Sequence, residues 1–262
     1  MESPVILHIP HSSRIIPEEY LSDFLAAPDE ELLFMTDAYT DELFKLPYSE
    51  KLVFPVSRLV CDVERFRDDA REEMAKAGMG AVYTSDHALR PMRHVSPQQR
   101  ERILREFYDP HHEKLRAFVE ESLAGWEECI IIDCHSFSPV PLPYEPMQSK
   151  DRPDICIGTD DFHTPSGFAD RLSREFALMG YTVRMNDPYD GALVPLDYYK
   201  MDKRVISVMI EVNRTLYMDA HGNKSEGFGK LKADICNALT DTLTAHASGV
   251  CGDKIVPICG EK

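Results

Sequence analysis

Several apolar segments of this chain run directly into residues that could bind a metal ion or move a proton. Neutral imidazole is a good ligand for Zn²⁺. A carboxylate inside an apolar run is rarely a solvated surface charge. Residues that follow different strands at one sheet edge can share a site. The segments and the residues they lead to are 4–9 with His11, 129–132 with Asp133 and His135, and 205–210 with Glu211.

His11 and His135 are the predicted metal ligands, with Asp37 as the expected third. A hydrolytic zinc needs three protein ligands and one open position for water. Asp37 lies one helical turn before Asp41, which could support the site from behind. Simpler readings stay open, because His11 could brace a turn and Asp37 could lie on a solvated helix face. The zinc signature HExxH does not occur.

Glu211 is the predicted general base, because a buried carboxylate with a raised pKa can take a proton from water. The alternative is a structural ion pair with Arg214. His111 and His112 are adjacent, and one of them could face the site as an acid or oxyanion partner. Helical periodicity does not choose between the two, and His112 is the one we assign.

Arginines near these segments could bind a substrate carboxylate, because guanidinium groups bind carboxylates in bidentate fashion. For each of them a surface salt bridge is the simpler alternative. No GxSxG, GxGxxG or P-loop motif occurs, which disfavours serine-hydrolase, dinucleotide and P-loop chemistry. The predicted substrate-binding residues are Arg58, Arg65, Asn213 and Arg214.

Short apolar strands separated by helices predict an α/β fold, with a mainly parallel mixed sheet and helices on both faces. Ligands of such sheets bind beyond the carboxyl ends of the strands. Strands are expected at 4–9, within 51–60, and at 129–133, 154–158, 181–185 and 205–212. Helices are expected at 29–46, 96–124, 165–180 and 228–247, and long loops at 66–96 and 136–153.

Composition predicts one globular domain over residues 1–262, with a loosely attached tail from about Ser248. The net charge of -16 disfavours nucleic acid and anionic membranes as partners and favours a small-molecule substrate. The 7 cysteines form no CxxC motif, and no signal peptide or membrane span is visible. We therefore expect a cytoplasmic protein. The sequence does not determine the oligomeric state.

At these residues the chain resembles the N-formylglutamate amidohydrolase family. The matching segments occur in the family's order and cover about residues 5–220. They are His8-Ile-Pro-His-Ser-Ser13, Thr36-Asp-Ala-Tyr-Thr-Asp41, Ser57-Arg-Leu-Val-Cys-Asp62 with Arg65, Tyr108-Asp-Pro-His-His112, Asp133-Cys-His-Ser136, Asp154-Ile-Cys-Ile-Gly158, Asn186-Asp-Pro-Tyr-Asp-Gly191, and Ile210-Glu-Val-Asn-Arg214 with Leu216-Tyr-Met-Asp219.

The resemblance implies a phosphorylase/hydrolase-like α/β fold, similar to zinc exopeptidases. It also implies hydrolysis of N-formyl-L-glutamate to formate and L-glutamate, late in histidine degradation. It implies one Zn²⁺ on two histidines and a carboxylate, a strand-borne glutamate as base, and arginines on the substrate. These roles match His11, Asp37, His135 and Glu211 with Arg58, Arg65 and Arg214.

Two segments depart from the family pattern. Glu64 stands where the family often has asparagine, and 186–191 carries an acid where a basic residue is usual. Both changes add negative charge near the expected anion pocket, so another N-acyl amino acid or a small amide remains open as the substrate. Two other functions also remain open: a non-catalytic amino-acid-binding protein, and a carboxypeptidase-like hydrolase of short peptides.

Overall fold

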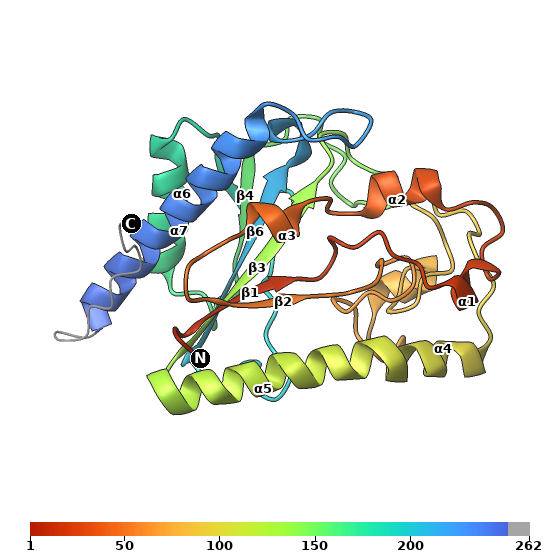
Figure 1. The fold of residues 1–262 in the computed structure, drawn as a ribbon, viewed down its shortest axis with the longest axis horizontal. Helices are drawn as coiled ribbons and strands as arrows, with labels where there is room; N and C mark the ends of the chain where they lie inside the picture. The colour runs from red at the N-terminus through yellow and green to blue at the C-terminus, as the bar shows by residue number, and fades with distance from the viewer. Residues whose placement is uncertain (251–262) are drawn as a thin grey trace.

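The computed structural model describes residues 1–250, apart from the side chain of Val250, and is built around one six-stranded sheet (Figure 1). The strand order is β2-β1-β3-β6-β4-β5. All neighbouring pairs are parallel except β4 and β6, which are antiparallel, so the predicted mainly parallel mixed sheet is confirmed. The strands are β1 (Val5–Ile9), β2 (Glu50–Val53), β3 (Cys129–Phe137), β4 (Ile155–Gly158), β5 (Val183–Met185) and β6 (Val205–Asn213).

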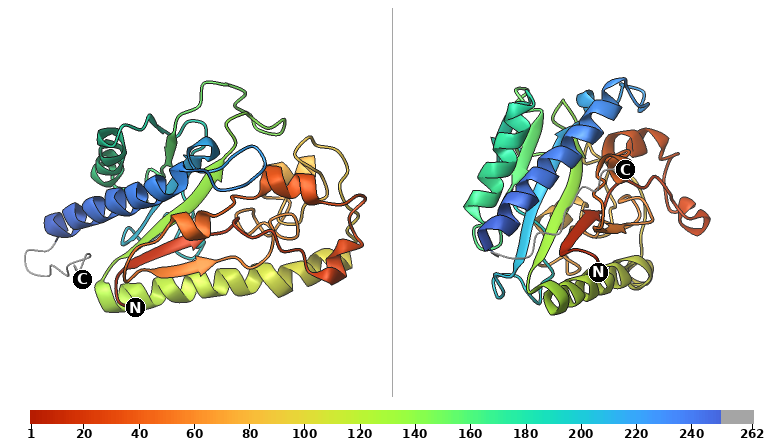
Figure 2. Two further views of the ribbon diagram at one scale, coloured as in Figure 1. Left: turned by 45° about the horizontal axis from the view of Figure 1, so that its top comes forward. Right: turned by 60° about the vertical axis from the view of Figure 1, so that its left-hand side comes forward.

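Helices cover both faces of the sheet, with α6 and α7 on one face and α5 on the other (Figure 2). None of the helices in residues 1–250 combines the length and the apolar character needed to cross a bilayer. The helices are α1 (Glu18–Leu21), α2 (Asp29–Met35), α3 (Thr40–Leu43), η1 (Glu73–Ala77), α4 (Pro97–Ile103), η2 (Leu104–Tyr108), α5 (Asp109–Trp126), α6 (Ser166–Leu178), η3 (Arg214–Leu216) and α7 (Gly227–Val250). Because α7 continues to Val250, the tail expected from Ser248 does not begin there, and its remainder lies outside the described residues.

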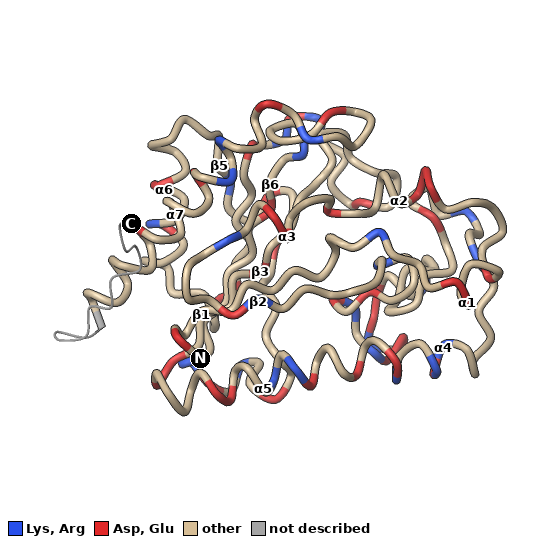
Figure 3. The backbone as a smooth tube through the Cα atoms, viewed as in Figure 1, with Lys and Arg blue, Asp and Glu red and all other residues tan. Residues whose placement is uncertain are grey.

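The long helix expected at 96–124 is present as α4, η2 and α5 in succession. Ser96 caps it by accepting a hydrogen bond from the Gln99 backbone, and the Gln99 side chain bonds back to the Ser96 N–H. A π-helical turn, η2, precedes Pro110. The nitrogen of Pro110 carries no hydrogen and cannot donate an α-helical hydrogen bond. Acidic and basic positions are interspersed along α5 (Figure 3), as expected for a helix with one solvated face.

The prediction of one helix over 29–46 is wrong, because the chain leaves helical geometry between α2 and α3. Thr36 is extended, Tyr39 has a left-handed φ of 67°, and the Asp37 backbone N–H donates to the carbonyl of His11 at 3.0 Å. Asp37 and Asp41 therefore do not share a helix face. Instead, the backbone bond draws Asp37 toward the end of β1.

The strand prediction within 51–60 is correct only for β2, which ends at Val53. Beyond it, residues 54–65 form an irregular segment that crosses the carboxyl ends of the strands. Two backbone bonds hold this segment: Phe54 N–H donates to Ile9, and Ser57 N–H donates to Ile15. The side chains of residues 58–65 are thus positioned by a loop rather than by a strand.

Successive side chains of β3 point to opposite faces of the sheet, one toward the core and the other toward the site. Ile132 and Cys134 belong to the apolar cluster under α6 and α7, whereas Asp133 and His135 point to the opposite face. On that opposite face Leu115 of α5 belongs to a cluster with the start of β3, and His111 of α5 contacts His8 of β1. The later residues of β3 and β6 are left to line a cavity, at the carboxyl ends where the fold predicted a site.

Candidate metal centre

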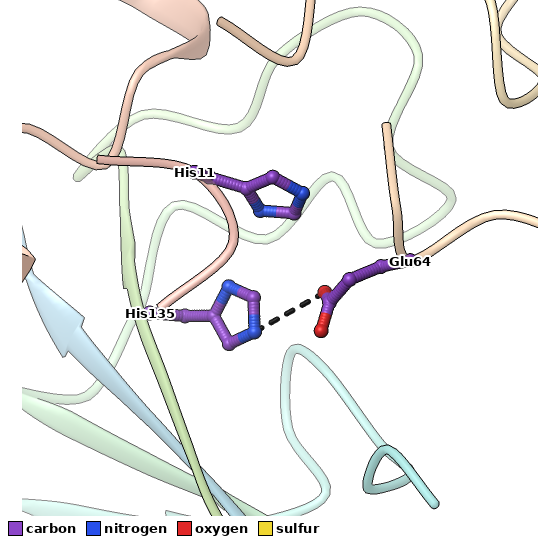
Figure 4. Close-up of side chains that lie close together, drawn as sticks. All are labelled: His11, Glu64 and His135. Carbon is purple, nitrogen blue, oxygen red and sulfur yellow. Dashed lines mark ion pairs between the residues drawn. The ribbon is translucent and has the colours of Figure 1, made fainter. Parts of the chain in front are cut away.

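Three side chains converge at the carboxyl ends of β1 and β3: His11, Glu64 and His135 (Figure 4). Each offers one ligand atom, and these atoms all lie within 4.8 Å of one another. The rings of His11 and His135 have centroids 5.2 Å apart, and Glu64 Oε2 is 3.2 Å from His135 Nε2. The side chains of His11 and His135 therefore lie close together, as the sequence predicted for residues at neighbouring strand ends.

His11 is held from behind by Asp62, which is fully buried. His11 Nε2 lies 3.0 Å from Asp62 Oδ1. Burial alone would raise the pKa of Asp62, but Arg58 and His11 hold that pKa well below its usual range. An ionised carboxylate can only accept hydrogen bonds, so His11 Nε2 carries the proton. Nδ1 of His11 is then free to bind, and it has no hydrogen-bond partner among the described residues.

His135 is held in the same way by Asp37. Its Nδ1 donates to Asp37 Oδ2 at 3.1 Å, and Arg214 Nη2 donates to the other oxygen of that carboxylate at 2.9 Å. Burial would raise the pKa of Asp37, but the adjacent imidazoles of His11 and His135 and the charge of Arg214 hold it well below its usual range. The opposite nitrogen, His135 Nε2, lies 3.2 Å from Glu64 Oε2 and 3.1 Å from Asp133 Oδ1, but neither contact has hydrogen-bond geometry, and no described residue makes a hydrogen bond to it.

The atoms left over fit a divalent metal ion. His11 Nδ1, His135 Nε2 and Glu64 Oε1 are all buried and lack hydrogen-bond partners within residues 1–249. Buried polar atoms without partners are costly, so three of them together indicate a missing common partner. Two imidazoles and one carboxylate are a ligand set of catalytic zinc, and ligating histidines usually donate their other nitrogen to a carboxylate.

Asp37, the carboxylate expected as the third ligand, lies next to both histidines, with its Oδ2 3.1 Å from His135 Nδ1 and 3.6 Å from His11 Nδ1. The carboxylate that shares the group with His11 and His135 is Glu64, while Asp37 bonds the far nitrogen of His135. Asp41, expected to support the site, forms no hydrogen bond or ion pair with either of these described histidines; its backbone carbonyl accepts from Lys51. Sequence reasoning missed Glu64 because it read this residue only as a departure from the family pattern. The signal that could have found it is its place between Asp62 and Arg65, both already singled out.

Glu211 lies beside the centre, as predicted. It pairs with His135 across β3 and β6, so both side chains leave the same face of the sheet. Burial, with Asp37 nearby, raises the pKa of Glu211 to about 8, although His135 and Arg214 act in the opposite direction. Its Oε2 has no hydrogen-bond partner among the described residues. A buried carboxyl with these properties can accept and return a proton near neutral pH.

The predicted substrate arginines divide into two kinds. Arg58, Arg65 and Arg214 all line the cavity, which has a volume of about 430 Å³. Arg58 and Arg214 donate to Asp62 and Asp37, respectively. No hydrogen bond from the Arg65 guanidinium to a described residue is found.

Two predicted residues are not brought to this cavity. The Asn213 side chain accepts from the Thr215 backbone and donates to the Pro153 carbonyl, so local structure uses its amide. His112 Nε2 donates to the Val63 carbonyl at 2.8 Å, and its ring lines a neighbouring cavity. His111 is buried against His8, with their Nε2 atoms 2.9 Å apart.

Comparison with known proteins agrees with this architecture. A family model described as N-formylglutamate amidohydrolase matches residues 3–218. No curated protein matches the chain.

Two solved structures show the same fold. One is N-formylglutamate amidohydrolase from Ralstonia eutropha JMP134, with a TM-score of 0.85, 24% identity, and coverage of 95% of this chain and 96% of that chain. The other is gene product Atu2144 from Agrobacterium tumefaciens, with a TM-score of 0.65, 21% identity, and coverage of 92% of each chain. The α/β fold class expected from the sequence, a mainly parallel mixed sheet with helices on both faces, is confirmed.

Proposed function

The chain belongs to the N-formylglutamate amidohydrolase family, and from that premise we propose that it hydrolyses the amide bond of an N-acyl amino acid with one bound Zn²⁺. One observation carries the proposal. Three buried ligand atoms without partners converge beside a carboxyl that also has a free oxygen, Glu211 Oε2. N-formyl-L-glutamate, the substrate in the family's name, is the first compound to test.

In this proposal His11, Glu64 and His135 hold the metal, and Asp62 and Asp37 orient the two imidazoles. An ion on these ligands would polarise the amide carbonyl and acidify the attacking water. The family resemblance and the His₂Glu donor set both support zinc. Because a 2-His-1-carboxylate set also suits Fe(II), metal analysis decides the identity.

Glu211 is the proposed general base. Its free Oε2 would accept the proton of the attacking water, and the carboxyl would then return a proton to the departing nitrogen. Its raised pKa favours the second half of this transfer, because the protonated carboxyl persists to about pH 8. His112, which we had expected to be the acid, is supported less well, because it opens on the neighbouring cavity.

Arg65 is the proposed anchor for the substrate carboxylate. It lines the cavity, and its buried Nε has no hydrogen-bond partner among residues 1–249. A guanidinium can bind a carboxylate through two parallel hydrogen bonds, and these would fix the amide relative to Glu211.

Three further expectations extend this proposal. The chain would act as a single amidohydrolase domain, because one sheet and the loops at its carboxyl edge form the whole centre. It would work in the cytoplasm, where reduced cysteines are stable. If N-formyl-L-glutamate is the substrate, the reaction would be a step of histidine degradation.

The experiment is a metal analysis combined with an assay over N-formyl and N-acetyl amino acids and dipeptides. We expect about one zinc per chain and hydrolysis of N-acyl amino acids in preference to dipeptides. Glu211→Gln keeps the shape of the side chain but removes the base. It should lower kcat by about three orders of magnitude while the metal content stays unchanged.

Glu145→Gln is the matched control, because Glu145 lines the same cavity but pairs with Arg152. It should keep most of the activity. Full activity in Glu211→Gln would remove Glu211 from its role. Bound metal and bound ligand without turnover of any amide would instead favour a binding protein.

A further inference from the structure

The arginines of the cavity differ in how far their charge is already used, and the difference bears on the substrate. Among described residues, Arg58, Arg65 and Arg214 are the arginines that line the cavity, and no lysine lines it. A dicarboxylate substrate such as N-formyl-L-glutamate needs two cationic partners in a site closed to water. The number of guanidinium groups left free is therefore informative.

Arg214 has no free face. Its Nη2 donates to Asp37, its Nη1 to the Phe34 carbonyl at 2.6 Å, and its Nε to Ser136 Oγ at 3.2 Å. All three nitrogens are occupied, and the charge is neutralised by Asp37. A substrate carboxylate could reach Arg214 only by displacing the contacts that hold His135 in place.

Arg58 is also committed to a metal-centre carboxylate. Its Nε and Nη2 both donate to Asp62 Oδ2, at 3.2 and 2.7 Å. Tyr83 donates to the same oxygen at 2.6 Å. Because Asp62 orients His11, withdrawing Arg58 toward a substrate would leave a buried carboxylate under-compensated, which is costly.

Arg65 is different. The nearest carboxylate, Asp62, is 3.9 Å from its Nε, which is beyond hydrogen-bonding distance. Its side chain is 24% exposed, so it can meet a ligand. Arg65 is thus the cavity arginine that makes no hydrogen bond to a described carboxylate, whereas Arg58 keeps only its Nη1 unbonded and its charge is offset by Asp62.

The remaining walls supply no second cation. They are apolar or aromatic at Phe137, Leu142, Tyr189 and Met209, acidic at Glu145 and Asp190, and carry hydroxyl groups at Ser138 and Tyr144. A second carboxylate would find neutral donors there but no second free positive charge, and burying a charge without an ionic partner is unfavourable.

We propose, resting on the amide hydrolysis proposed above, that the substrates are N-acyl amino acids with an uncharged side chain and one carboxylate, which binds Arg65. The side chain of the amino acid then contacts the apolar walls. N-formyl-L-glutamate is a poor substrate in this account.

The test compares N-formyl-L-glutamine with N-formyl-L-glutamate on the zinc-loaded protein, because these compounds have the same shape and differ by one charge. We expect kcat/KM to favour the glutamine compound by at least about tenfold. Converting the remaining carboxylate of N-formyl-L-glutamine to an amide should cost about 10- to 100-fold. Arg65→Met should abolish that second difference and raise KM more than it lowers kcat. Arg65→Lys should restore part of it.

Arg67→Met is the matched control. Arg67 is bound by Asp109 and Glu101 and lines the neighbouring cavity, so both ratios should stay as in the wild type. Equal or faster hydrolysis of N-formyl-L-glutamate would overturn the proposal, as would an unchanged carboxylate preference in Arg65→Met. If no formyl compound is hydrolysed, the proposed reaction fails. Calorimetric binding of free L-glutamine against L-glutamate then decides the ligand class separately.

Discussion

Two similar units hold the candidate metal centre, and they are built by different means. In each, an arginine pairs with a carboxylate, and the carboxylate bonds the far nitrogen of a histidine. We call them the loop unit and the strand unit. The loop unit is Arg58, Asp62 and His11, and the strand unit is Arg214, Asp37 and His135.

The strand unit takes its precision from the backbone. His135 lies within β3, which pairs with β6 through nine consecutive positions, and Arg214 follows β6 directly. Such a ladder fixes where His135 and Glu211 point before any side chain bonds.

The loop unit depends on side chains instead. Asp62 accepts from His11, Arg58, Tyr83 and the Glu64 backbone N–H. One carboxylate thus positions both a metal ligand and the chain that carries another. The two units make the same contacts to a histidine, but a strand ladder positions one and side-chain hydrogen bonds position the other. We therefore expect a substitution to disturb the loop unit more than the strand unit.

Removing a ligand from either side should have the largest effect. His135→Ala and Glu64→Gln each delete one of three donors, so bound zinc should fall from about one per chain to near zero. Turnover should fall at least about a thousandfold. Metal content and kcat are the measurements.

Glu113→Gln, which changes an exposed carboxylate on α5, is the control and should bind zinc normally. If Glu64→Gln retained its zinc while His135→Ala lost it, Glu64 would not be a ligand and the loop side would need another donor.

Removing the carboxylate behind each histidine should separate the two units. Such outer partners are typically worth 10- to 100-fold in metal affinity. We expect Asp62→Asn to reach the upper end of that range and Asp37→Asn the lower, because β3 still holds His135. Competition with a chelator gives both affinities. A larger loss in Asp37→Asn would reverse the proposed ranking of the two supports.

Acid should weaken the protein through the histidines beneath the loop unit. Burial lowers the pKa of His112 to about 4 and that of His111 to about 2. The unfolded chain therefore takes up protons below about pH 6.5 that the folded chain refuses, so stability falls as the pH falls from about 6.5 toward 4.

His112→Gln keeps a donor for the Val63 carbonyl but cannot titrate. In the metal-stripped protein, its loss of unfolding free energy between pH 7 and pH 5 should be smaller than that of the wild type by about 1 kcal/mol. Urea denaturation measures both values. Identical slopes in the two proteins would show that His112 is not held neutral.

The smallest effect is expected at Asp41. A continuous helix over 29–46 would have placed it behind the centre, but the structure ends α2 at Met35. Asp41→Asn should change zinc affinity by less than about twofold. A loss comparable to that of Asp37→Asn would mean that the helical arrangement exists in solution.

His11, His135 and Glu211 could be placed at one edge of the sheet from the sequence, whereas the loop that carries Arg58, Asp62 and Glu64 could not. Apolar runs that lead to His11, His135 and Glu211 define strands, and parallel strands bring their carboxyl ends together. Residues 54–65 carry no such period, and their path depends on backbone bonds to distant residues, such as Asp62 N–H to Ala81. The one local sign of the role of Glu64 is its position between Asp62 and Arg65.

The same reasoning explains the positions of Asp37 and Asn213. Residues 29–46 have good helical composition, but the bond from Asp37 to the His11 carbonyl overrides that preference. Asn213 follows β6 as expected, yet its amide is used by the turn at Thr215. The end of a predicted strand shows which residues reach the edge of the sheet. It does not show which of their side chains form hydrogen bonds within the following turn and so cannot bind a ligand.

The most direct test of the account is a crystal structure of the zinc-loaded protein, with anomalous diffraction recorded at the zinc edge. We predict one peak coordinated by His11 Nδ1, His135 Nε2 and a Glu64 carboxylate oxygen, with Asp62 and Asp37 bonded to the far imidazole nitrogens. A peak coordinated by Asp37 in place of Glu64, or no peak between the two histidines, would contradict it.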